Sequence, residues 1–141
     1  MAQGKPEITD DLLGYLRDRF PDMFAKAELP DHGVRCSAGW LDLIVETLER
    51  LKEQSEKECV PIPQIRAIKE KFGALRISAQ PLTDQMDSIL VEAMSKSQAI
   101  CENCGAPGKA LVTGTGYKLT LCNRCKNLVD AEEVEKGYPD E

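Results

Sequence analysis

Two short stretches decide the fold: CENCG at residues 101–105 and CNRC at residues 122–125. Each holds two cysteines three positions apart, and seventeen residues separate the two pairs. A C-x2-C turn offers two adjacent vertices of a tetrahedron to a metal ion, and this separation is typical of a four-cysteine zinc site. The sequence therefore predicts one metal centre. Its expected ligands are Cys101, Cys104, Cys122 and Cys125.

Zinc is the expected ion, in a structural role. Four thiolates leave no open coordination position, whereas catalytic zinc usually keeps one for water or substrate beside three protein ligands. Residues 109–121 contain two β-rich runs around Gly114-Thr115-Gly116, which predicts a hairpin joining the two halves of a zinc ribbon. Two matched pairs with a hairpin between them favour zinc over a redox dithiol. Ligand identity alone leaves iron open as an alternative.

The chain before the cysteines is predicted to be mostly helical. Apolar residues recur at helical spacing after Thr9, after Ser37 and after Thr83, each of which is a suitable N-cap. The Ser37 helix should fray after about Glu56, because two prolines follow.

Residues 64–79 differ from these segments, because Gly73 breaks any long helix and the apolar residues that follow alternate with polar ones. We expect a β-hairpin near residues 64–79, with its turn at residues 71–73. The predicted fold class is therefore α+β, with a helical N-terminal part and a C-terminal zinc ribbon. The expected parts are an α-rich domain at 1–99, the zinc ribbon at 100–129 and an acidic tail at 130–141.

Composition and charge narrow the functional classes. The chain has 141 residues with 42% hydrophobic and 30% charged residues, as in an ordinary globular protein, and no apolar run long enough to span a membrane. Its N-terminus has no apolar segment of the secretory kind, so a cytoplasmic location is expected. Thiols stay reduced there, which favours metal ligation over disulfides for the six cysteines.

Catalytic signals are weak. His32 and Cys36 lie four residues apart and could form a nucleophile with its base, but the sequence supplies no strong third partner. Cys59 is interpreted as a small buried apolar residue. The sequence contains no phosphate-binding loop, paired-carboxylate motif or serine elbow. We therefore expect a protein that is not an enzyme.

Four segments together resemble a known group of proteins: GWLDLI at 39–44, KEKFGALR at 69–76, CENCGAPG at 101–108 and LCNRC at 121–125. The chain resembles small, functionally uncharacterised bacterial and phage proteins that have a helical front half and a C-terminal zinc ribbon. The resemblance spans roughly residues 36–126. It implies the fold and the zinc site, and it implies no activity.

The first functional hypothesis is a binding module for a protein partner, such as a phage- or prophage-encoded regulator or inhibitor of a host machine. The charge is uneven, with a net of −5 over residues 1–60, +4 over residues 61–129 and −5 over residues 130–141. The acidic helices could compete for a basic groove on a partner. The oligomeric state is left open by the sequence.

Nucleic-acid binding through the basic segment 66–126 is the alternative hypothesis. The candidate partner or nucleic-acid surface comprises Lys69, Lys71, Arg76, Lys109, Lys118, Arg124 and Lys126. The overall charge of −6 opposes this reading, and the chain has only seven aromatic residues. Many members of the resembling group have an aromatic residue after the equivalent of Arg76, whereas this chain has Ile77. That departure argues against an aromatic stacking platform at this position.

Overall fold

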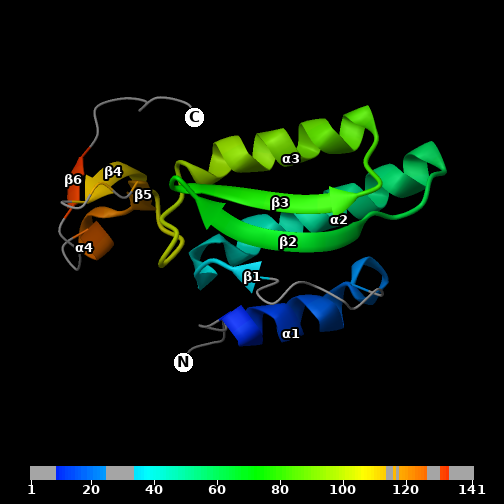
Figure 1. Ribbon diagram of the computed structural model, residues 1–141, viewed down its shortest axis with the longest axis horizontal. Coiled ribbons are helices and arrows are strands. Elements are labelled where there is room, and N and C mark those ends of the chain that lie inside the picture. Colours follow the sequence, from blue (N-terminus) through cyan, green and yellow to red (C-terminus); the bar gives the residue numbers. More distant parts are fainter. Residues whose placement is uncertain (1–8, 25–33, 114–115, 117, 127–130, 134–141) are drawn as a thin grey trace.

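The computed structural model describes residues 9–24, 34–113, 116, 118–126 and 131–133. Within them the chain is α+β, as predicted, and is built on two three-stranded sheets (Figure 1). The strand order is β1-β2-β3 in the first sheet and β5-β4-β6 in the second. The elements are α1 (Thr9–Arg19), β1 (Val34–Arg35), α2 (Leu41–Glu58), β2 (Gln64–Lys71), β3 (Ala74–Gln80), α3 (Asp84–Ser97), β4 (Lys109–Thr113), β5 (Lys118–Leu121), α4 (Asn123–Lys126) and β6 (Ala131–Glu133).

The first sheet and three helices enclose the larger core. Helix α2 packs against α3, α3 packs against β3, and α1 lies beside β1 (Figure 1). Their apolar stripes meet in one core that includes Trp40, which is fully buried. The largest fully buried side chains of this core are Leu12, Leu16, Met23, Trp40, Ile44, Leu48, Leu51, Ile68, Leu75 and Met86. The amphipathic patterns in the sequence therefore identify the core-facing sides of the helices correctly.

The helix ends follow the sequence signals only in part. Thr83 caps α3 as predicted, because its hydroxyl accepts a hydrogen bond from the Met86 amide at 3.2 Å. Ser37 does not cap α2. It precedes a short 3-10 turn at Ala38–Trp40 and makes no capping hydrogen bond with its side chain. Helix α2 continues to Glu58, two residues beyond the expected fraying point, and ends at Cys59 in the left-handed conformation.

Strands β2 and β3 form the predicted hairpin, with Lys71 opposite Ala74 across a two-residue turn. Both turn residues have positive φ, 56° at Phe72 and 78° at Gly73, as a type I′ turn requires. Glycine tolerates this conformation, whereas a residue with a side chain loses about 1–2 kcal/mol there. Phe72 is nevertheless 43% exposed, so burial of its ring offsets only part of that cost.

The second sheet reaches into the segment predicted as an acidic tail. Residues 131–133 form β6, which pairs antiparallel with β4 from Leu111 to Thr113. The expected hairpin of β4 and β5 is present, with Leu111 opposite Leu119. Residues 134–141 of the predicted tail lie outside the described residues.

The two sheets meet at a junction made mostly of backbone. The Gly39 amide donates to the Glu102 carbonyl at 3.0 Å, and the Trp40 indole N–H donates to the Ile100 carbonyl at 2.9 Å. From β5, the buried hydroxyl of Thr120 donates to the Gly73 carbonyl at 2.6 Å. These bonds tie the start of α2 and the turn of the first sheet to the segment that bears the cysteines.

Gly39 has no room for a side chain, which leads to a first prediction. A Cβ atom at this position would lie 2.3 Å from the Cys101 carbonyl oxygen. Gly39→Ala should therefore lower the free energy of unfolding by about 2–3 kcal/mol, measured by urea denaturation. Gly14→Ala is the matched control, because a Cβ there meets nothing within 4 Å in the middle of a helix. It should raise stability by about 0.5–1 kcal/mol, and equal effects of the two changes would contradict the tight junction.

Candidate metal centre

The structure brings the four predicted cysteines together. Their sulfur atoms all lie within 4.8 Å of one another. The Sγ atoms of Cys104 and Cys122 are 3.6 Å apart, far longer than the S–S bond of about 2.05 Å in a disulfide. All four cysteines are free. Tetrahedral metal–sulfur bonds of about 2.3 Å place sulfurs about 3.8 Å apart, so the observed spacing suits a shared metal ion.

A tight turn positions the first pair of cysteines. The Gly105 amide donates to the Cys101 carbonyl at 2.9 Å, and the Cys101 amide donates to the Ala106 carbonyl at 2.7 Å. Gly105 has a φ of 89°, a conformation that glycine adopts without steric cost. The glycine that follows the pair in the sequence therefore allows the chain to fold back, so that Cys101 and Cys104 face the same point.

The second pair lies at the end of β5 and in the short α4 that follows it. The Cys125 amide donates to the Cys122 sulfur at 3.4 Å and, as the largest cause, lowers the pKa of Cys122 to about 6. The thiolate is the form that binds metals, and this hydrogen bond favours it at Cys122. From the first pair's turn, the Asn103 side-chain amide donates to the Cys125 sulfur at 3.2 Å. The two halves of the site thus contact each other directly.

The cysteines also form much of the local core. Cys101 is fully buried and Cys125 is 8% exposed, and among the described residues they form the buried apolar cluster of this part together with Leu111 and Leu121. Four such side chains provide little hydrophobic stabilisation. The clustered cysteines are therefore a large part of what packs the described portion of the second sheet.

The remaining two cysteines have different surroundings. Burial, with the charges of Glu102 and Glu70, raises the pKa of Cys36 to about 12. This thiol stays protonated at neutral pH, which opposes a nucleophilic role. His32, its expected base, lies outside the described residues. Cys59 is exposed, so its interpretation as a buried apolar residue is wrong: it caps α2 in a left-handed conformation outside the core.

The predicted basic surface divides into two groups. In the first group, Lys71 and Lys118 each place their ammonium nitrogen 5.5 Å from the centre of the Phe72 ring. Lys69 and Arg76 belong to the same group and lie opposite each other on the two strands of the hairpin. The other three, Lys109, Arg124 and Lys126, lie beside the second cysteine pair. Phe72 was missed as a candidate site residue, although its place next to Gly73 in a two-residue turn was a usable signal.

No family model, curated protein or solved structure matches the chain. Similarity to bacterial and phage zinc-ribbon proteins therefore stays a prediction. Among the described residues, no helix combines the length and apolar character needed to cross a bilayer.

Metal ligation predicts a difference between two exposed cysteines, Cys59 and Cys104. In the metal-bound protein, N-ethylmaleimide should modify Cys59 quickly and Cys104 slowly, because a metal-bound thiolate is a weaker nucleophile. A chelator should make Cys104 react as fast as Cys59, whereas buried Cys36 should stay unmodified up to pH 9. Peptide mass spectrometry measures each site. Equally fast reaction of Cys104 before and after chelation would contradict metal binding.

Proposed function

We propose that the chain is a non-enzymatic zinc-ribbon binding protein in which one structural zinc ion is held by Cys101, Cys104, Cys122 and Cys125. The observation that carries this proposal is the convergence of the four sulfurs to within 4.8 Å. Four thiolates form a closed, soft ligand set that suits Zn²⁺ and leaves no position for a substrate. Zinc would supply structural energy here rather than chemistry.

The free energy of zinc binding supports a structural role for the ion. Binding of zinc to such a site contributes on the order of 10 kcal/mol of apparent folding energy, which is far more than the small core around Leu111 and Leu121 can provide. Zinc would thereby keep β5 in position, with Thr120 bonded to the turn of the first sheet. The metal would thus join the two sheets into one binding body.

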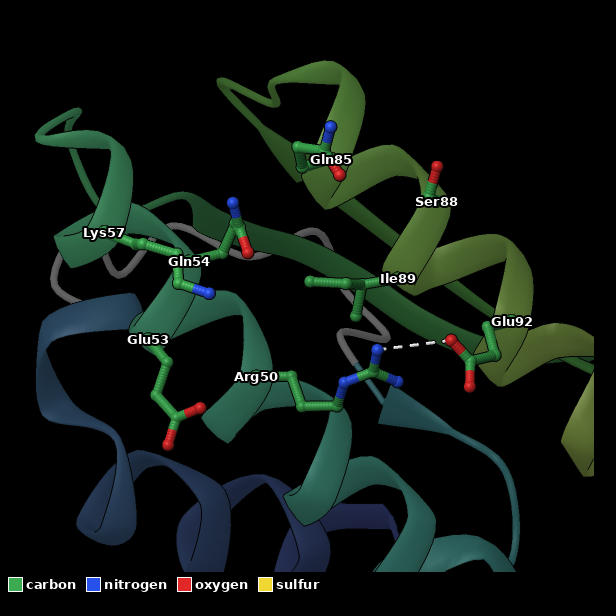
Figure 2. A pocket seen from close by; sticks show the side chains of 8 residues that line it. All are labelled: Arg50, Glu53, Gln54, Lys57, Gln85, Ser88, Ile89 and Glu92. Atoms are coloured by element: carbon green, nitrogen blue, oxygen red, sulfur yellow. Dashed lines mark hydrogen bonds and ion pairs between the residues drawn. The ribbon is translucent and has the colours of Figure 1, made fainter.

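The partner that we propose is a protein with a basic surface, and α2 and α3 would form the binding face. The exposed acidic side chains of α2 are Asp42, Glu46, Glu49, Glu53 and Glu56. A groove of about 300 Å³ runs between α2 and α3, bridged by the Arg50–Glu92 ion pair at 3.2 Å (Figure 2). Complementary charge would steer a basic partner to this face and fix its register.

Glu53 is central to this acidic face. It lines the groove between α2 and α3 and also a second groove beside Arg19 and Phe20 of the α1 region. Several neighbouring carboxylates are already paired, such as Glu49 with Arg19 at 2.9 Å and Glu46 with Lys96 at 3.5 Å. Glu53 makes no ion pair within the described part of the chain, which leaves its charge available to a partner.

The zinc site predicts a specific metal content. Protein purified without chelator should carry one zinc per chain by elemental mass spectrometry. Cys104→Ser should lose most of it, whereas Cys59→Ser should retain it. Asn103→Ala, which removes the hydrogen bond to Cys125, should weaken zinc affinity about 10-fold or more. Stoichiometric iron in place of zinc would contradict the choice of metal, and full zinc retention in Cys104→Ser would contradict the ligand set.

The acidic face predicts a charge-dependent protein complex. A nuclease-treated bacterial lysate should yield a stoichiometric protein partner with the wild-type chain as bait. Glu53→Lys should reduce its recovery about 5-fold or more, because reversal replaces attraction by repulsion at the centre of the face. Ser95→Lys is the control, because Ser95 is exposed and lines neither groove. Equal recovery by wild type and Glu53→Lys, with zinc content intact, would contradict this face.

A further inference from the structure

We propose that the turn of the β2–β3 hairpin binds single-stranded nucleic acid, with the Phe72 ring stacking on a base and the surrounding cations contacting phosphates. This surface lies beside the second sheet, at the opposite end of β2 from the C-terminal end of α2 (Figure 1). Strand β2 has 8 residues and is therefore about 26 Å long, which keeps its two ends well apart. The inference goes beyond the protein-binding face, and it rests on the proposed zinc site only for the placement of β5.

Phenylalanine is an unfavourable residue at this position, because the backbone φ is positive and the side chain is exposed. A type I′ turn prefers Asn, Asp or Gly at its first central position, and here a phenylalanine adopts a φ of 56°. Its ring is 43% exposed rather than part of either core. A strained, exposed aromatic residue outside both buried cores points to a functional contact made by the ring.

Two lysines, one from each sheet, place their positive charges near the Phe72 ring. The ammonium groups of Lys71, on β2, and Lys118, on β5, both lie 5.5 Å from the ring centre. The ring and the two cations are therefore parts of one site. This juxtaposition exists because Thr120 bonds β5 to the hairpin turn at Gly73.

The positive charge continues along the hairpin. Lys69 lies opposite Arg76, and side chains two residues apart on a strand share a face, so Lys69 and Lys71 line the same side. Both lysines are exposed. The intervening Glu70 points to the other face and is half-buried, with its carboxylate accepting from the Gly73 amide at 2.8 Å. Arg76 adds a buried Nε atom that has no hydrogen-bond partner among the described residues.

Single-stranded nucleic acid fits this combination best. Unpaired bases offer π-faces to an exposed aromatic side chain, and their phosphates match a run of cations. A duplex hides its base faces, so Phe72 would contribute little to duplex binding. An acidic protein would use the lysines but would have no need for an exposed ring in a strained turn.

The test uses fluorescence anisotropy with labelled oligothymidylate and oligouridylate of about 12 nucleotides. Wild type should bind at low salt. The slope of log affinity against log salt should be about −3 if Lys69, Lys71, Arg76 and Lys118 each contact a phosphate. Phe72→Asn supplies the residue that the turn prefers, so the hairpin should form at least as well while affinity falls about 10-fold. Phe72→Tyr should bind with nearly wild-type affinity, because it keeps an aromatic ring.

Charge variants separate the cations of this site from cations elsewhere. Lys118→Gln should weaken binding and reduce the salt slope by about 0.7, because one phosphate contact is lost. Lys57→Gln, at the C-terminal end of α2 (Figure 2), should change neither. Zinc content and thermal unfolding of each variant show whether the ribbon is intact, so loss of zinc is distinguished from loss of stacking.

Three results would overturn the inference. The first is no binding of either oligonucleotide by zinc-loaded wild type at low salt. The second is unchanged affinity in Phe72→Asn. The third is binding of duplex or polyglutamate as tight as that of the single strands, with no dependence on Phe72, which would instead assign the lysines to a duplex or an acidic protein. Equal affinity for the two oligonucleotides supports stacking without a sugar preference, and a preference for one supports the same site and identifies the nucleic acid.

Discussion

Among the described residues, the second sheet has few buried apolar side chains with which to hold its position. Its cluster contains Leu111 and Leu121 together with two of the cysteines, Cys101 and Cys125. Convergence of four sulfurs on one point is therefore the constraint on which this part of the molecule depends. A metal ion at that point would add to the small core that the described residues of this sheet provide.

The same constraint acts on the rest of the molecule through the junction. The segment that carries the first cysteine pair contacts Gly39 so closely that no side chain fits there, and it accepts hydrogen bonds from Gly39 and Trp40. On the other side, Thr120 bonds to Gly73 and brings Lys118 beside Phe72. A metal ion held by the cysteine cluster would thus influence the geometry of the basic hairpin surface, while the acidic face of α2 and α3 rests on the larger core.

Local patterns made part of this structure predictable. The cluster of four cysteines follows from their spacing, the hairpin at residues 64–79 from the change of period at Gly73, and α3 from its regular apolar stripe and Thr83 cap. Tertiary features were not predictable in this way. Strand β6 forms because β4 offers a free edge, although its acidic sequence carries no strand signal. Lys118 reaches Phe72 from a strand that is distant in the sequence, and the exposure of Cys59 depends on where α2 ends.

Hydrogen exchange at the Gly39 amide, followed by NMR with and without a chelator, tests most directly whether the metal centre fastens the second sheet to the first. This amide donates to the carbonyl of Glu102, the residue that follows Cys101. The account predicts that metal removal accelerates its exchange by a large factor, while amides around Leu48 in α2 stay protected. Equal exchange of the Gly39 amide in the two states would contradict the account.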